Sequence, residues 1–164
     1  MLGILSKKVS SFRRNECGVQ LVELAIALPV LVLLFAAVAE FGRYFYEYTT
    51  LAKGSRTAVR FLATARTNGE DDEAAQNLVV YGNLAGTGSP IVSGLKRENV
   101  DITRHDINGG LVTEGIPNTV TIRIKDFNHS PVFNLGKLVT ASASLNIEVK
   151  PSVTMRYLLT QTPS

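Results

Sequence analysis

The chain has few of the residues that hold small exported domains together. It has one cysteine, Cys17, and no tryptophan among its 164 residues. A single cysteine excludes an intramolecular disulfide, so a domain in an oxidising compartment would depend on side-chain packing alone. Cys17 also precedes the long apolar run instead of following one, which disfavours attachment of a lipid to it.

The chain also lacks the basic surface that nucleic acids require. It has 17 Lys and Arg residues and 14 Asp and Glu residues, and the first 18 positions hold four of the basic residues and one of the acidic ones. The remaining 13 basic and 13 acidic residues balance. The high isoelectric point is therefore a property of the N-terminal segment, and we expect no nucleic-acid partner.

Motifs for catalysis, cofactors and metals are lacking as well. Gly86-Thr-Gly88 is too short for a phosphate-binding loop. The acids at 70–73 lack the spacing of a calcium loop and fit the positive end of a helix dipole better. His105 and His129 show no triad pattern, and we expect both to be surface residues. The sequence predicts no enzyme activity and no catalytic, cofactor or metal site.

What the chain does have is a long apolar run. From Val19 to Ala39 only Gln20 and Glu23 are polar. As a helix rising about 1.5 Å per residue, the run would span roughly 30 Å, the thickness of a bilayer core. Pro29 removes one backbone hydrogen bond and is predicted to kink this helix. We expect a retained membrane helix, and the alternative is a secreted protein cleaved after Ala39.

The flanking charges predict the orientation of this helix. The segment before it carries four basic residues against one acidic residue, and positive segments stay on the cytoplasmic side. Residues 41–164 are then expected outside the cytoplasm. The aromatic residues at 44–48 either lie at the membrane interface or pack against the domain that follows.

Beyond the apolar run the pattern predicts an α+β domain over 41–164. Apolar residues recur at helical spacing through Phe41–Ala65, which predicts one long helix of about 45 residues with an inserted half and an exposed half. It should stop at Thr67–Gly69, and a second short helix should end near Gly82. The basic residues of the exposed half favour a solvated face over a surface for an acidic neighbour. They are Arg43, Lys53, Arg56, Arg60 and Arg66.

Alternating segments then indicate strands at Val100–Thr103, Thr119–Lys125, Val139–Val149 and Val153–Leu158. A turn signal at Asn108–Gly110 and short connections predict an antiparallel meander that is apolar on one face. Because the chain has no tryptophan or disulfide, this small sheet needs the exposed half of the long helix as cover.

The N-terminal residues resemble those of a known family. A basic leader, Gly18, Glu23 at the fifth place after it and an apolar helix look like the processing signal of type IV pilins and pseudopilins. The segments Val22–Leu31 and Ala39–Arg43 are similar to TadE-like proteins of the tight-adherence (Tad or Flp) pilus. Major Flp pilins are shorter and favour tyrosine where this chain has Leu24, so a major subunit is disfavoured. The related TadF family shares the anchor and stays open.

The resemblance implies a minor pseudopilin that acts in assembly of Tad pili for surface adherence. A prepilin peptidase would cut between Gly18 and Val19, removing the leader 1–18 and leaving a transmembrane helix at 19–40. Glu23 would act in processing or pair with the α-ammonium group of a neighbouring subunit. The implied partners are that peptidase, other pilins and pseudopilins, the inner-membrane Tad machinery and membrane lipid. The implied location is the inner membrane, with the C-terminal domain extracytoplasmic, or the pilus itself.

A binding module on an uncleaved signal anchor is the alternative of a different class. Its helix would hold an extracytoplasmic domain that binds a ligand or partner, and its leader would persist. The mass of the mature chain separates this alternative from the pseudopilin.

Overall fold

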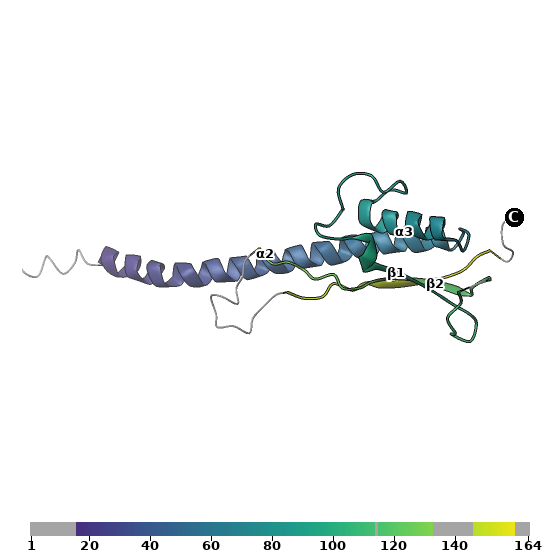
Figure 1. Cartoon of the computed structure of the whole chain (residues 1–164). Coiled ribbons are helices and arrows are strands. Elements are labelled where there is room, and N and C mark those ends of the chain that lie inside the picture. Colours follow the sequence, from purple (N-terminus) through teal and green to yellow (C-terminus); the bar gives the residue numbers. More distant parts are fainter. Residues whose placement is uncertain (1–15, 114, 133–145, 160–164) are drawn as a thin grey trace, which may run out of the picture. The chain divides into compact units, whose positions relative to one another are not determined.

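The computed structural model of the protein describes residues 16–113, 115–132 and 146–159. The chain divides into two compact units, Met1–Phe41 and Gly42–Ser164, and one helix runs through both. The predicted α+β class is confirmed, with a long N-terminal helix, a second short helix and a three-stranded antiparallel sheet (Figure 1). In chain order the elements are α2 (Glu16–Leu62), α3 (Gly69–Tyr81), the 3-10 helix η2 (Arg97–Asn99), β1 (Val100–His105), β2 (Thr119–Ile124) and β3 (Ser152–Arg156).

Helix α2 has 47 residues, close to the predicted length. It begins at Glu16, before the start of the apolar run, and it ends at Leu62, earlier than the stop expected at Thr67–Gly69. The helix ends in a tighter 3-10-like turn, because Thr64 N donates to Phe61 O (3.1 Å), only three residues earlier. The helix continues through Pro29, so the kink there stays a prediction.

A close approach of two helices explains the glycine in the exposed half of α2. A Cβ atom on Gly54 would lie 3.4 Å from the carbonyl oxygen of Val79 in α3 and 3.5 Å from its Cα atom. Glycine weakens a helix interior by about 1 kcal/mol relative to alanine. At this position the missing side chain lets the α3 backbone pack directly against α2.

Helix α3 has the predicted end and well-defined caps. The Asn68 side chain accepts a hydrogen bond from Asp71 N at 2.8 Å, which satisfies one free amide of the first turn. Gly82 adopts the left-handed conformation at φ 73° and donates to Leu78 O at 3.1 Å. The acids of the first turn lie at the positive end of the helix dipole, as the sequence indicates.

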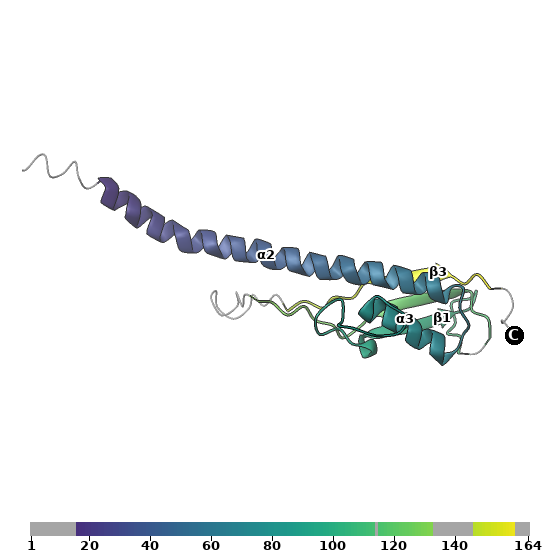
Figure 2. The same cartoon turned by 90° about the horizontal axis from the view of Figure 1, so that it is seen from above.

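The sheet has the order β1-β2-β3 with both pairings antiparallel. Ile122 lies opposite Ile102 on one side and Val153 on the other. Figure 2 shows α2 and α3 beside each other over the strands, in keeping with the contact at Gly54. The buried core joins these helices to the sheet, so the exposed half of α2 provides the cover that the strands need. It includes Leu51, Ala58, Val59, Leu62, Ala75, Val79, Val120, Ile122 and Ile124.

The pairing of β2 with β3 extends into a two-stranded arm across a bulge. The register runs from Arg123↔Ser152 to the bridge Asn128↔Glu148, so the β2 side carries one extra residue. Asp126, at φ 52°, lies in this bulge. We call Phe127–His129 and Ile147–Val149 the β-arm; its rungs include Val149 N to Phe127 O at 2.8 Å.

One predicted strand lies mostly outside the described residues, and the chain after one predicted turn follows a path that was not expected. Of the strand predicted at Val139–Val149, only 146–149 are among the described residues, and they contribute to the β-arm. The turn at Asn108–Gly110 does form, but the chain after it returns along the outer edge of β1, where Val112 N donates to Arg104 O at 2.9 Å. Only then does the chain cross to β2.

Candidate functional site on the long helix

The first half of α2 presents an apolar surface. Between Val19 and Val38, all large apolar side chains except the half-buried Leu33 are from 48% to 72% exposed. Soluble monomers rarely leave so large an apolar patch in water. The helix is long and apolar enough to cross a membrane once.

Glu23 is the one carboxylate on this apolar surface. It shares a shallow groove along one helix face with Ile26, Ala27, Val30 and Leu31. Among the described residues no cation pairs with it. In a bilayer this carboxylate therefore needs a partner from outside its own helix.

Gly18 and Val19, the predicted cleavage position, lie in the first turns of α2 and are exposed. A Cβ atom on Gly18 would meet nothing within 4 Å. Gly18 also lies within a helix, where it lowers stability relative to alanine. The fold therefore gives no reason for a glycine here, in contrast to Gly54.

A buried polar cluster ties the β-arm to α2. His129 is 1% exposed, and its Nδ1 atom lies 2.7 Å from Glu47 Oε2. Its ring meets the ring of Tyr44 edge-on, with centroids 5.8 Å apart, and Arg43 approaches Glu47 at 3.6 Å. The expectation that His129 is a surface residue is wrong, because a carboxylate 82 positions earlier satisfies its buried nitrogen. His105, in β1, is only partly exposed.

This cluster joins the β-arm to α2, and its histidine is buried. At 1% exposure His129 cannot reach a substrate. The sequence offered one weak signal for it, because Glu47 is the only acid in the aromatic stretch 41–48. Nothing local to His129 indicated the pairing.

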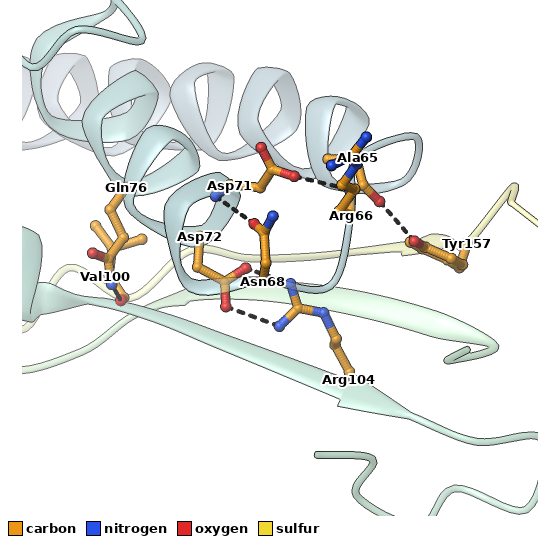
Figure 3. Close-up of polar contacts among 9 residues, drawn as sticks. All are labelled: Ala65, Arg66, Asn68, Asp71, Asp72, Gln76, Val100, Arg104 and Tyr157. Atoms are coloured by element: carbon orange, nitrogen blue, oxygen red, sulfur yellow. Dashed lines mark hydrogen bonds and ion pairs between the residues drawn. The ribbon is translucent and has the colours of Figure 1, made fainter. Parts of the chain in front are cut away.

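The acids of the first turn of α3 serve as partners for arginines and backbone amides. Asp72 forms two contacts with the guanidinium of Arg104, one of them at 3.0 Å (Figure 3). Asp71 accepts from the backbone amide of Arg66 at 2.9 Å. Glu73 forms an ion pair with Arg97 of η2. Across the described ranges no group of three His, Cys, Asp or Glu residues could hold a metal ion.

The chain after β3 is fastened to the end of α2. The Tyr157 hydroxyl donates to Ala65 O at 2.6 Å (Figure 3). Leu158 N donates to Ala63 O at 2.9 Å. Burial raises the pKa of the Tyr157 hydroxyl; Arg104 acts in the opposite direction, and Asp71 adds to the rise.

The outward face of α2 in the second unit is basic. Lys53, Arg56 and Arg60 are exposed, and none forms an ion pair with a residue in the described part of the chain. Arg43 differs from them, since it lies beside Glu47. The expectation of an exposed basic face is met, and these three residues are named the basic stripe below.

A comparison with protein families identifies the segment that contains these features. The family model described as TadE-like protein matches residues 18–60, which confirms the resemblance over this part of α2. The matched segment includes Gly18, Glu23 and the basic stripe. No curated protein and no solved structure matches the chain. The match supports an association with the Tad pilus system.

Proposed function

We propose that this chain is a TadE-like minor pseudopilin that acts in the assembly of Tad pili and is processed by a prepilin peptidase. One observation carries the proposal. Within the TadE-like segment, a single unpaired carboxylate, Glu23, lies on an exposed apolar helix five positions after Gly18.

Processing at Gly18 is supported by the absence of a packing role for this glycine. It makes no close packing contact that a larger side chain would disturb. A peptidase site with no room for a side chain would account for it. Cleavage between Gly18 and Val19 would remove the basic leader 1–18 and create an α-ammonium group on Val19.

Assembly through Glu23 follows from the energetics of a charge in lipid. A carboxylate costs about 2.5–3.5 kcal/mol at the centre of a membrane helix and less near the interface. Pairing with the α-ammonium group of Val19 in a neighbouring subunit would offset the burial of both charges. With such pairing, subunits would associate with the cleaved chain, which has the Val19 α-ammonium group, and not with the uncleaved precursor.

The proposal includes a location and partners. The chain would cross the inner membrane once, with its N-terminus cytoplasmic and Gly42–Ser164 outside the cytoplasm. Its partners would be the prepilin peptidase, other pilins and pseudopilins, the inner-membrane Tad machinery and lipid. A TadF-type pseudopilin would share all of these features.

The deciding experiment is co-expression of the full chain with a Tad prepilin peptidase, followed by intact-mass measurement. We expect loss of Met1–Gly18 and a new N-terminus at Val19. The leader should persist in the variant Gly18→Ala and with a peptidase whose catalytic aspartates are replaced. A leader that persists in the unmodified chain with an active, matched peptidase would favour the signal-anchored binding module, and cleavage after Ala39 would indicate a secreted protein.

A further inference from the structure

Two helices of the second unit carry clusters of exposed charge of opposite sign. The basic stripe of Lys53, Arg56 and Arg60 occupies positions i, i+3 and i+7 of α2, which lie on one face of a helix. From residue 48 to residue 69 the chain has no acid. Three adjacent cations without acids repel one another, so this face gains from an external anion.

The complementary charges lie on α3 of the same unit. Its first turn is the acidic turn Glu70–Glu73, four carboxylates in succession. Glu70 is exposed and pairs with no described residue, and Glu73 is 58% exposed in a surface pair with Arg97. Surface pairs of this kind contribute little and exchange partners readily. Glu70 and Glu73 are therefore available to a second molecule.

The two charged surfaces lie at the same end of α2. Arg60 is in the last turn of α2, and only the six residues 63–68 separate that helix from α3. The stripe and the acidic turn belong to different helices, which lie beside each other over the sheet (Figure 2).

We propose that the basic stripe of one copy binds the acidic turn of a second copy of this chain. The contact joins two different surfaces, so it does not close on itself and each copy keeps one surface free for the next. It aligns copies side by side in one direction, as a shared membrane anchor requires. The inference rests on the proposed function only in placing both copies in one membrane; it does not depend on peptidase cleavage.

The test uses full-length chains in membranes, with a benzophenone photocrosslinker in place of Thr57, which is exposed between the cations of the stripe. We expect a dimeric product whose crosslinked peptide contains residues 69–76. The triple variant K53E/R56E/R60E should lower its yield about ten-fold, as should E70K/E73K. The matched control K96E/R123E/R156E makes the same charge change at other exposed cations and should leave the yield unchanged.

A charge exchange makes the test decisive. One chain carries the reversed stripe and the other carries the reversed acidic turn, and neither should form the crosslinked dimer when it is expressed alone. When the two chains are co-expressed with different tags, the crosslinked dimer should form again. Recovery in the mixture excludes a loss of folding as the cause. The proposal is overturned if the charge reversals leave the yield of crosslinked dimer unchanged or if the mixture of the two variants does not restore that yield. It is also overturned if the crosslinker at position 57 reacts only with lipid or with a different protein. Leader removal, measured on the same samples, reports on the proposed function separately.

Discussion

The two units of the chain share one helix and use it in opposite ways. Before Phe41, helix α2 exposes its large apolar side chains, and Ile26 is 69% exposed. From Leu51 onward the same helix buries apolar side chains against a second helix and a sheet, and Leu51 and Leu62 are at most 1% exposed. Phe45, Tyr46 and Tyr48, between the two parts, are still exposed. The first unit thus depends on its surroundings for stability, while the second carries its own core.

The two halves of α2 differ in how their apolar residues are distributed around the helix. In the first half apolar residues occur all round the helix, which is typical of a segment that faces lipid. From Leu51 to Leu62 the buried apolar residues keep to one face, and the opposite face carries the basic stripe. The pattern changes between Tyr48 and Leu51, a few residues beyond the boundary between the units, while the helix itself continues without a break.

Equal substitutions in the two units should therefore have very different effects. Ile122, in the central strand, is fully buried, so Ile122→Ala should lower the free energy of unfolding by about 2–5 kcal/mol. Ile26→Ala, on the exposed half of α2, is the matched control and should change it by less than about 0.5 kcal/mol. Urea unfolding of the full chain in detergent micelles, followed by circular dichroism, measures both. Similar losses for the two variants would contradict the comparison.

A smaller effect should come from the junction of the β-arm with α2. Glu47→Ala leaves the buried His129 nitrogen without its partner and should cost about 1–3 kcal/mol of unfolding free energy. His129→Ala should cost a similar amount, and the double variant should cost less than the sum because the two residues share one contact. The same unfolding measurement gives the coupling. Strict additivity would show that the 2.7 Å contact contributes nothing.

The smallest effect should come from Tyr157 and should depend on pH. Its folded-state pKa is raised, so the unfolded state releases the proton first and stability should fall as the pH rises above about 10. Tyr157→Phe should cost about 1 kcal/mol at neutral pH through the lost bond to Ala65 O, and it should show a shallower alkaline decline. Thermal unfolding between pH 8 and 11 compares the two chains. Parallel curves would rule out the contribution of Tyr157 to the alkaline loss.

Much of this fold could be predicted because its signals are local. The long helix follows from periodicity within a few turns, and the end of α3 follows from Gly82 in the left-handed conformation. The strands β1, β2 and β3 follow from alternation. The sequence also placed Glu23, Arg43, Lys53, Arg56 and Arg60 on the long helix, where the structure has them. Arg66 was expected there too, but it lies beyond the end of α2 at Leu62.

The rest depends on contacts between distant positions. The burial of His129 requires Glu47, and neither residue has a neighbour that indicates the other. The bulge at Asp126 is a matter of register, which is settled only when β2 and the segment before β3 align; Asn99 then binds the two bulge carbonyls at 3.1 Å each. The role of Gly54 could not be predicted either, because a glycine that weakens one helix is explained only by the second helix against it.

The bond from Tyr157 to Ala65 joins positions 92 residues apart, and under the proposed location it would have a consequence for the timing of export. A chain that crosses the membrane behind its anchor delivers α2 first and β3 last. Until Leu158 emerges, β2 would pair with β1 alone and the end of α2 would lack its fastening. The second unit could then complete its sheet only after nearly the whole chain had crossed. In that interval the free edge of β2 would be open to pairing with a chaperone or a neighbouring chain.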